Sequence, residues 1–515
     1  MIGMTVTVCE VIEEPQRSWR FRCGLGLLIF LMAFAGGCDR PNYQELVLKS
    51  QVNELRDRVK ELEEQVKTAK QTTNNVPRQV QSNLPPDLAK QLAELRAQVS
   101  ALNDQLTAYR VKEEKAQLQA QLEVAEQLKK VGAKLRQDDQ GKIIEIDLSE
   151  AVYDLPLIER LPEINSLTRL TMSGPNVTPP IFSLIGKLPG LQYLSLELTG
   201  ANEQSVAQLV DLNELTFLQL FRSDVNDAAL EFIAKLPKLE QLRVAQTRVT
   251  DAGLRHFEGH RRLVAIDLTD CTGITQEGLK SLSTIPTLKF IKVWGRRIDD
   301  EGMDHLAKLT NLEVLGLNDT RVTDVGIAKL SGLKKLREVH LVRTAIGDDS
   351  VKILSQMSEM RSFRLRDTQI SDVALSYLSE LKNLEILDIS ETNSPGVTDQ
   401  GMAHLRKLTN LKELNLWTTK VTDAGVAEIS QIPTIRWLNL DKTAITDAAI
   451  KSLESMTQLE YLHVGSNELT DASVSSFMKL KNLKYLNLSL TKISEEGYFD
   501  IDDELAPLGC NVIGP

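Results

Sequence analysis

Residues 312–335 read LEVLGLNDTRVTDVGIAKLSGLKK, and this 24-residue pattern recurs along most of the chain. In a strand, residues two apart face the same way, so Leu315 and Leu317 are expected to point into a core. Farther along, Thr323 suits the N-cap of a helix, and Asp324 favours the positive end of its dipole. The pattern therefore predicts a short strand, a tight turn and a short helix in every unit.

The units follow one another with a nearly constant step of 24 residues. The step lengthens to 25 after Leu263 and to 27 after Leu384, around residues 272–273 and 393–396, which have the composition of turns. A single unit cannot close its own core, so neighbouring units must stack into a solenoid. The units begin at Ile143, Leu167, Leu191, Leu215, Leu239, Leu263, Leu288, Leu312, Leu336, Met360, Leu384, Leu411, Ile435, Leu459 and Leu483.

These units resemble leucine-rich repeats of the TDxGL kind, which occur in several bacterial proteins and in the substrate-recognition arms of F-box proteins. The resemblance covers about residues 143–515, and it is specific for fold but weak for function. It implies an α/β solenoid of about 15 repeats with a C-terminal cap, parallel strands on the concave face and helices on the convex face. We expect the Thr320 hydroxyl to satisfy buried turn backbone, Gly326 to let helices approach closely, and Cys510 to be buried.

The first 37 residues have the character of an export signal. Three arginines precede an apolar run, residues 23–35, that is too short for a comfortable membrane span. The run ends in Ala-Gly-Gly before Cys38, which resembles the bacterial lipoprotein class, in which such a cysteine is lipidated and becomes the mature N-terminus. The resemblance implies a signal peptide over residues 1–37, a lipid anchor at Cys38 and a location on the periplasmic or outer-surface side of the bacterial cell envelope. An uncleaved signal anchor is the alternative.

A linker, residues 38–47, is expected to lead from the anchor into a helical segment. Apolar residues follow a 4-3 rhythm over residues 48–70 and again over residues 88–136, which is typical of coiled coils. The intervening residues 71–87 contain three prolines, which a helix interior does not tolerate. Two arrangements fit this pattern: an extended all-α stalk that oligomerises through its coiled coil, or a hairpin of two helices within one chain.

The composition and motifs argue against several classes of function. A formal net charge of −11 argues against nucleic-acid binding. The cysteines form no closely spaced pair, and the sequence contains no phosphate-binding loop, serine-hydrolase elbow or zinc-protease motif. The recurring Thr-Asp pairs fit helix capping, and His256 and His260 lack a third ligand, so we expect a surface pair on an outer helix. We therefore predict no enzyme activity, no catalytic residue, no cofactor and no metal.

The third, fifth and seventh residues of each unit alternate with the buried leucines, so they should face the concave side. Aromatic and basic residues gather there, and Tyr, Trp and Arg are frequent interface anchors. We therefore predict that a protein or glycan partner binds this face; the alternative is that the aromatic residues only pack along the sheet. The predicted binding residues are Phe217, Phe221, Arg243, Phe290, Lys292, Trp294, His340, Arg343, Arg364, Arg366, Trp417, Trp437, Tyr461 and Tyr485.

Together these features predict a membrane-anchored, extracytoplasmic recognition or scaffold protein. The alternative is a structural envelope protein that oligomerises through its coiled coil and binds no selective ligand. Selective capture of a partner by the concave face would distinguish the two functions.

Overall fold

The computed structural model describes residues 43–73, 86–392 and 396–514. The chain divides into two compact units, Met1–Gln119 and Ala120–Pro515. The predicted signal peptide, Cys38 and most of the proline-containing linker lie outside the described residues. Within the described ranges, no helix is both long and apolar enough to cross a membrane.

The first unit holds two helices, α2 (Tyr43–Thr73) and the greater part of α3 (Pro86–Lys130). Two ion pairs join them: Arg110 lies 3.0 Å from Glu45, and Arg96 lies 2.7 Å from Glu63. Glu45 lies near the start of α2 and pairs with Arg110, whereas Glu63, farther along α2, pairs with Arg96, which comes earlier in α3. The two helices therefore run antiparallel. The described residues thus form the hairpin. The heptad pattern alone was compatible with either a hairpin or an extended stalk.

The second unit begins with the end of α3, where Val124 and Leu128 are buried in the core of the repeats. A short strand, β1 (Lys134–Gln137), then pairs antiparallel with β2 (Ile143–Asp147). The helix therefore ends at Lys130 rather than at the expected residue 136. The helix is shorter than expected because the chain after it forms β1. This strand covers the open edge of the sheet and the exposed end of the core.

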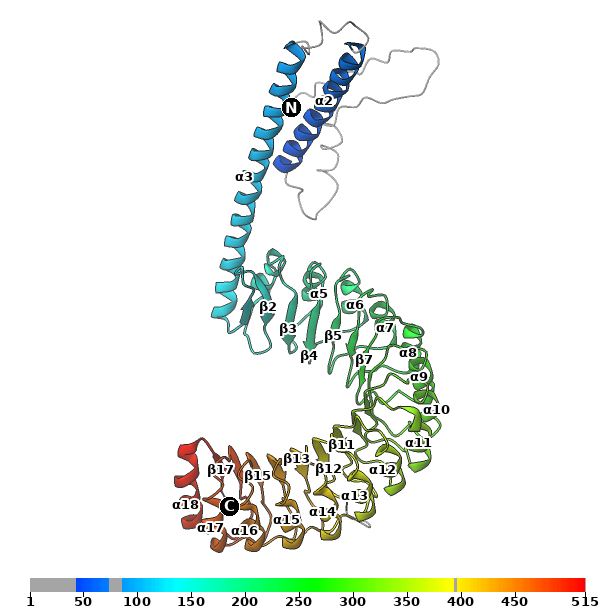
Figure 1. The fold of residues 1–515 in the computed structure, drawn as a ribbon, viewed down its shortest axis with the longest axis vertical. Helices are drawn as coiled ribbons and strands as arrows, with labels where there is room; N and C mark the ends of the chain where they lie inside the picture. Colours follow the sequence, from blue (N-terminus) through cyan, green and yellow to red (C-terminus); the bar gives the residue numbers. More distant parts are fainter. Residues whose placement is uncertain (1–42, 74–85, 393–395, 515) are drawn as a thin grey trace, which may run out of the picture. The chain divides into compact units, whose positions relative to one another are not determined.

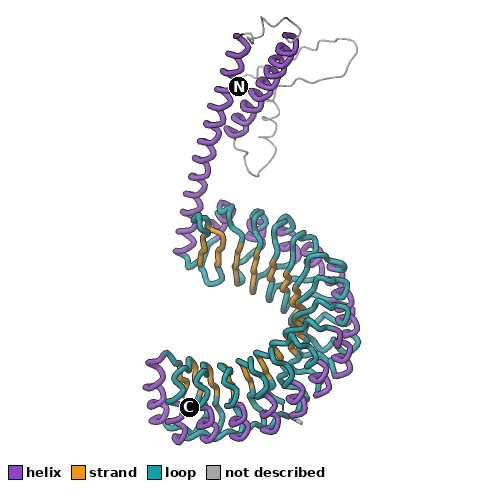
Figure 2. Tube along the Cα trace, viewed as in Figure 1, coloured by secondary structure: helices purple, strands orange, loops and turns teal. Residues whose placement is uncertain are grey.

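One 17-stranded sheet runs through the second unit, and its strands from β2 onward pair in parallel. The strands line the inner side of a curve and the helices lie on its outer side (Figures 1 and 2). This arrangement confirms the predicted α/β solenoid. The remaining strands are β3 (Arg169–Ser173), β4 (Tyr193–Glu197), β5 (Phe217–Gln219), β6 (Gln241–Arg243), β7 (Ala265–Leu268), β8 (Phe290–Val293), β9 (Val314–Gly316), β10 (Glu338–His340), β11 (Ser362–Arg364), β12 (Ile386–Asp388), β13 (Glu413–Asn415), β14 (Trp437–Asn439), β15 (Tyr461–His463), β16 (Tyr485–Asn487) and β17 (Asn511–Ile513).

Most helices of the convex face begin at capping side chains. Thr323 Oγ1 accepts a hydrogen bond from the backbone N–H of Val325, as expected of an N-cap. Thr323 also donates its own N–H and hydroxyl to Asp300, one repeat earlier, at 2.8 and 2.7 Å. Asp300 follows Asp299 and stands where most repeats carry the aspartate of a Thr-Asp pair. An aspartate at this position therefore joins neighbouring repeats, which the sequence pattern did not reveal. The helices are α4 (Leu155–Ile158), α5 (Pro179–Ile185), α6 (Glu203–Val206), α7 (Asp227–Ile233), α8 (Asp251–Leu254), α9 (Gln276–Leu282), α10 (Met303–Leu306), α11 (Asp324–Lys329), α12 (Asp348–Leu354), α13 (Asp372–Leu378), α14 (Asp399–Leu405), α15 (Asp423–Ile429), α16 (Asp447–Leu453), α17 (Val474–Phe477) and α18 (Glu495–Leu505).

A glycine often follows the Thr-Asp pair because the aspartate of the previous repeat occupies the space beside it. A Cβ added at Gly401 would lie 2.5 Å from Asp372 Oδ1 and 2.5 Å from Leu375 Cδ1. A Cβ at Gly326 would likewise meet the carboxylate of Asp300. The expected close approach of neighbouring helices is therefore confirmed.

The turn after each strand has its own regular features. Thr320 Oγ1 donates to the carbonyl of Leu317 at 2.7 Å, so the expected role of this hydroxyl is confirmed. Cys510 is buried in the closing half-repeat, also as expected. The residue at the eighth position of the unit, which usually precedes the hydroxyl, adopts a left-handed backbone with φ of 52–59° even where it is not glycine. These positions are Leu198, Arg222, Gln246, Asp270, Asp319, Arg343, Asp367, Glu391, Thr418, Lys442, Ser466 and Leu490.

Candidate binding surface on the concave face

Three columns of side chains cross the strands on the concave face, at the third, fifth and seventh positions of each unit. In the repeat of β8 these are Phe290, Lys292 and Trp294, each partly exposed, whereas Ile291 and Val293 between them are buried. All the predicted binding residues except Arg343 occupy these columns.

At β3 to β6 the columns hold two rings between two cations. The rings of Tyr193 and Phe217 stack with centroids 4.2 Å apart and planes 10° apart. The guanidinium of Arg169 lies 3.9 Å from the Tyr193 ring, and that of Arg243 lies 5.3 Å from the Phe217 ring. Phe221 has the guanidinium of the next residue 5.7 Å from its ring. Arg243 forms no ion pair within the described part of the chain.

The β8 residues lie closely together. The Lys292 ammonium is 5.0 Å from the centre of the Phe290 ring. The stem of Lys292 crosses Gly316 on the next strand, where an added Cβ would lie 2.8 Å from Lys292 Cγ. The indole Nε1 of Trp294 is buried, and none of the described residues accepts a hydrogen bond from it. A buried N–H donor without an acceptor costs about 1–3 kcal/mol. The hydrogen-bonding capacity of the Trp294 indole is therefore unused in this position.

His340 on β10 and Arg364 on β11 differ in how free they are. His340 is only 7% exposed, and its Nε2 lies 2.6 Å from Glu338. The hydrogen bond from His340 holds the pKa of Glu338 below its usual value, against the effect of burial, which raises it. Arg364, by contrast, is exposed and has no ion-pair partner among the residues that the structure describes.

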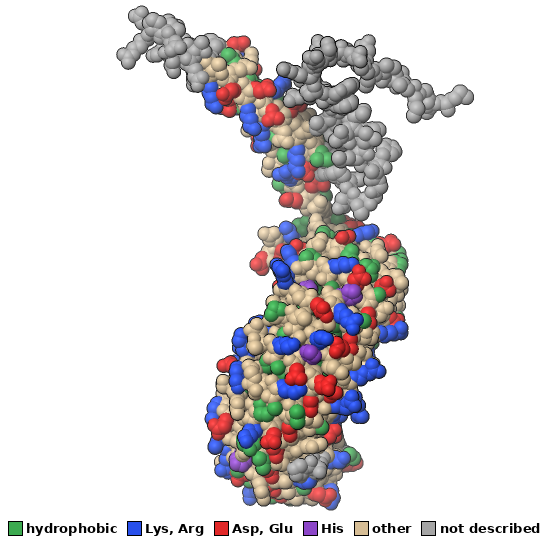
Figure 3. Space-filling model, turned by 90° about the vertical axis from the view of Figure 1, so that its right-hand side faces the viewer, with side chains coloured by type: hydrophobic (Ala, Val, Ile, Leu, Met, Phe, Trp, Pro, Cys, Tyr) green, Lys and Arg blue, Asp and Glu red, His purple; other side chains and the backbone are tan. Residues whose placement is uncertain are grey.

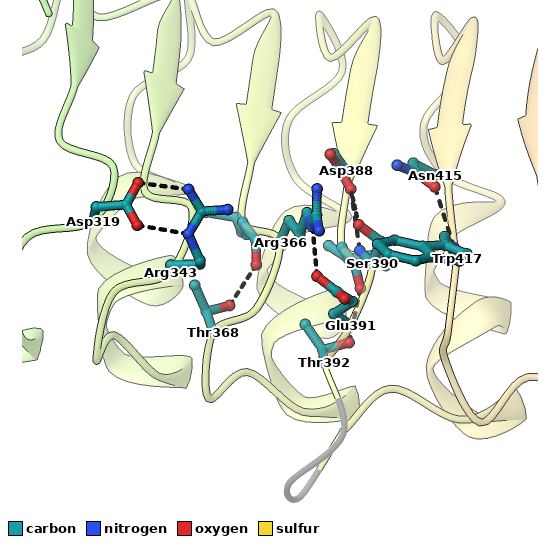
Figure 4. Close-up of polar contacts among 12 residues, drawn as sticks. Asp319, Arg343, Arg366, Thr368, Asp388, Ser390, Glu391, Thr392, Asn415 and Trp417 are labelled. Atoms are coloured by element: carbon teal, nitrogen blue, oxygen red, sulfur yellow. Dashed lines mark hydrogen bonds and ion pairs between the residues drawn. The ribbon is translucent and has the colours of Figure 1, made fainter. Parts of the chain in front are cut away.

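Arg343 lies in the turn after β10 and not in a concave column, so the expected placement was wrong. The strand alternation ends before this eighth position, where the backbone becomes left-handed. Two hydrogen bonds of 2.6 and 2.7 Å join Arg343 to Asp319 and raise the pKa of Arg343 (Figure 4). Arg366 donates to Glu391 at 2.5 Å, and its guanidinium lies 4.7 Å from the Trp417 ring (Figure 4). Both arginines are thus held within the chain.

The C-terminal part of the surface is a stack of three rings on β14, β15 and β16. The rings of Trp437 and Tyr461 are 4.6 Å apart at 12°, and those of Tyr461 and Tyr485 are 4.5 Å apart at 2°. Burial raises the pKa of the Tyr461 hydroxyl. Ring pairs of this kind stabilise neighbouring strands. For these residues the geometry is that of the alternative prediction, in which aromatic residues pack along the sheet.

The rim at the start of the strands carries charges that neutralise one another. Glu313 lies 2.9 Å from Lys289 and 3.4 Å from Arg337. Equivalent triplets form around Glu385 and Glu460. In each triplet the hydrogen bond from the lysine lowers the pKa of the glutamate. The lysines and arginines of these triplets therefore each have an acidic neighbour.

Three residues outside the predicted set take part in these contacts. Arg169 lies over the ring of Tyr193, which stacks on Phe217, whereas Glu338 lies against His340 and Glu391 against Arg366. Arg169 and Glu338 occupy the third position of their units, so their register was the available signal. Glu391 occupies the eighth position, and only the left-handed turn shows that this position can reach the seventh-position arginine.

The predicted histidine pair does not lie on one outer helix. The short 3₁₀ helix Arg255–Phe257 contains His256 but ends before His260. His260 Nδ1 instead accepts the backbone N–H of Leu263 at 3.0 Å, which holds a turn. Burial lowers the pKa of His260. Across residues 43–73, 86–392 and 396–514, no group of three or more His, Cys, Asp or Glu side chains could hold a metal ion.

A comparison with protein-family models matches residues 252–505 to the family described as a leucine-rich repeat region. The match agrees with the fold seen here and covers the central and C-terminal repeats. No curated protein matches the chain.

Among solved structures, the chain is similar to an internalin from Listeria monocytogenes, with 21% identity over 68% of this chain and 87% of the internalin, and a TM-score of 0.42. A leucine-rich-repeat protein of Leptospira interrogans shows 19% identity over 68% of this chain and 91% of its own, with a TM-score of 0.43. The ectodomain of the Arabidopsis receptor kinase HAESA, solved with a peptide hormone ligand, shows 15% identity over 78% and 77%, with a TM-score of 0.42. At these values the likeness concerns the repeat architecture and carries no information about a ligand of this chain.

Proposed function

We propose that this chain is an exported, lipid-anchored recognition scaffold that binds a protein partner along the concave face of its solenoid. One observation carries the proposal. Arg243, Lys292 and Arg364 occupy the fifth-position column on β6, β8 and β11, and none of them forms an ion pair with a described residue. We call these three residues the concave cations.

The concave cations differ from the other cations of the sheet, which have acidic neighbours at the rim. Asp267, in the same column between Arg243 and Lys292, is occupied: its carboxylate accepts the N–H and hydroxyl of Thr269 at 3.0 and 2.6 Å. Glu338 on β10 interacts electrostatically with Lys292 and Arg364 without forming an ion pair with either. A partner with acidic groups would add opposite charge along the column and would be oriented by it.

The extent of the column favours a macromolecular partner. The strand of Arg243 and the strand of Arg364 are five steps apart in the sheet. At about 4.8 Å per step, the concave cations span about 24 Å, which is the width of a protein interface and not of a small molecule.

The aromatic residues favour a protein over a glycan. A sugar packs on the open face of an aromatic ring, but both faces of Tyr461 are covered by Trp437 and Tyr485. Trp294 is the aromatic residue best suited to a partner, because a small rotation would let its unpaired indole N–H donate a hydrogen bond across an interface.

The membrane anchor is supported by the sequence before the helices. A basic segment, an apolar run and Ala-Gly-Gly before Cys38 fit export followed by lipid attachment. In the sequence, the helices α2 and α3 stand between this anchor and the repeats. An envelope protein that only spaces layers remains the competing function, since the ring stacks need no ligand.

The test is crosslinking capture from native membranes with the intact chain and with a Trp294→Ala/Arg364→Ala double variant. The proposal predicts a protein captured by the intact chain and lost from the double variant, with nearly unchanged thermal midpoints. Arg406→Ala is the matched control: it removes a convex-face cation that pairs with Glu428 and should leave capture intact. Identical capture by all three chains would favour the structural envelope protein.

A further inference from the structure

Two hollows lie on the rim of the solenoid where the turns leave the strands. Both are lined by turn hydroxyls, such as Thr320, and by left-handed residues, such as Arg343. The first rim hollow, about 510 Å³, is lined by Arg222, Asp224, Gln246, Arg248 and Asp270 among others. The second rim hollow, about 620 Å³, is lined by Arg296, Arg321, Arg343, Ala345, Asp367 and Glu391 among others.

The charged side chains of the first rim hollow pair with other side chains of the same hollow. Arg248 lies 2.8 Å from Asp224. Gln246 accepts from Arg222 at 2.5 Å and donates to Asp270 at 3.0 Å. Each charged side chain of this hollow thus has a partner within the hollow.

The second rim hollow has the same construction but leaves charges without partners. Arg343 is held by Asp319, and Glu391 is held by Arg366 (Figure 4). Arg296, Arg321 and Asp367 are exposed, and their side chains have neither an ion pair nor a hydrogen bond within the described ranges. The charge of Asp367 is felt by Arg343, whose pKa it helps to raise. Two cations therefore lie at the β8 and β9 end of the hollow and one carboxylate at the β11 end.

The repeat pattern is also broken where this hollow begins. Arg296 takes the position that Thr320 holds one repeat later, so a guanidinium stands where that repeat has a turn hydroxyl. Gly295 before it has φ of 145°, a conformation that side chains rarely allow, whereas the neighbouring turns have φ of 52–59°. Neither change is needed to build a repeat, because the other turns are built without it.

We propose that the second rim hollow binds an extended peptide segment that carries an acidic and a basic side chain four residues apart. The acidic side chain lies against Arg296 and Arg321, and the basic one lies against Asp367. The turns that carry these residues are two to three strand steps apart, or about 10–14 Å. Residues four apart in an extended peptide lie on one face and are about 13 Å apart, which matches this separation.

This site goes beyond the proposed function, since turns on the rim form it and not the strand columns that carry the concave cations. A partner bound on the concave face and a peptide in the second rim hollow are therefore separable. Variants of Arg296 and Arg321 should leave capture of the concave-face partner unchanged, and variants of the concave cations should leave peptide binding unchanged.

The test uses the full chain and two fluorescent nine-residue peptides of Ser and Thr with one Asp and one Lys, placed four positions apart or adjacent. At low salt, the proposal predicts that the spaced peptide binds at least about tenfold more tightly than the adjacent one by fluorescence polarisation. Arg296→Glu/Arg321→Glu should abolish this preference with an unchanged thermal midpoint.

Two control variants make the result specific. Arg222→Glu/Arg248→Glu alters the first rim hollow, and Trp294→Ala/Arg364→Ala alters the concave face; both should keep the preference. Failure of the spaced peptide to bind, equal binding of the two, or an unaltered preference in Arg296→Glu/Arg321→Glu overturns the inference. Loss of partner capture in Trp294→Ala/Arg364→Ala together with intact peptide binding would show that the two sites are distinct.

Discussion

At the scale of single residues, the Thr-Asp pair serves two repeats at once. The threonine caps its own helix, and the aspartate accepts two hydrogen bonds from the threonine of the next repeat, as at Asp399 and Thr422 (2.7 Å each). These carboxylates are occupied by backbone and hydroxyl donors. Their regular recurrence is therefore a consequence of stacking, and it gives no reason to assign acid–base chemistry to them.

Replacement of Gly401 tests this packing. Gly401→Ala should lower the free energy of unfolding by about 1–3 kcal/mol, because the new Cβ would press on Asp372 and Leu375. Gly332→Ala is the control, since nothing lies within 4 Å of a Cβ there, and its effect should stay within about 0.5 kcal/mol. Urea unfolding followed by circular dichroism measures both. Equal midpoints for the two variants would contradict the close packing.

Two partly buried histidines predict how stability depends on pH. Burial lowers the pKa of His260 and of His463 below the usual 6.5. The unfolded chain therefore binds protons more readily, so these residues contribute stability above about pH 6.5 that is lost as the pH falls through their folded pKa values. The thermal midpoint should fall between pH 7 and pH 5, and His463→Asn should reduce the fall. An identical fall in His463→Asn would show that His463 does not contribute.

At the scale of elements, the helical hairpin can be distinguished from a parallel stalk. Glu63→Cys and Arg96→Cys, introduced together and treated with a bismaleimide about 10 Å long, should link within one chain because the native side chains are in contact. Mass spectrometry of the crosslinked peptide identifies the link. Links found only between chains would contradict the hairpin and support an oligomeric coiled coil.

Most elements of the repeats could be predicted from the sequence, because strand, turn and helix each leave a residue pattern in a 24-residue period. Thr320 and Gly326 were assigned correctly because their roles are local to one or two units. Heptads, by contrast, are compatible with both a hairpin and a stalk. Most of the left-handed turn residues are not glycines, so their conformation leaves no signal in the sequence. Arg343 was misassigned although the register already gives it the eighth position of its unit.

The candidate site could be predicted only as a set of columns. Register alone shows which residues share a face, but not which of them already have partners. His340, Arg343 and Arg366 are bound to nearby carboxylates, whereas Arg243, Lys292 and Arg364 are not. That distinction depends on rotamers and on neighbours 24 residues away, and it is the distinction on which the proposed function rests.

At the scale of the solenoid, the two faces differ in how their charges are arranged. On the convex side, basic and acidic side chains are intermixed, with hydrophobic ones scattered among them (Figure 3). The concave face instead carries the concave cations in one column beside Trp294 and the stacked rings. The curve of the sheet turns these columns towards a common space (Figure 2), as expected of a repeat protein that binds a partner on its inner surface.

The most direct measurement is photo-crosslinking from two positions of a single repeat. Val314 begins β9 on the concave face, and Val325 lies on α11 of the convex face, where it is 66% exposed. In native membranes, a photoreactive amino acid at position 314 samples the concave face, and one at position 325 samples the convex face of the same unit. The account predicts that the partner is crosslinked from position 314 and not from position 325, and that Arg364→Ala removes the crosslink. A partner crosslinked from position 325 alone, or from both positions equally and regardless of Arg364, would contradict a concave recognition site.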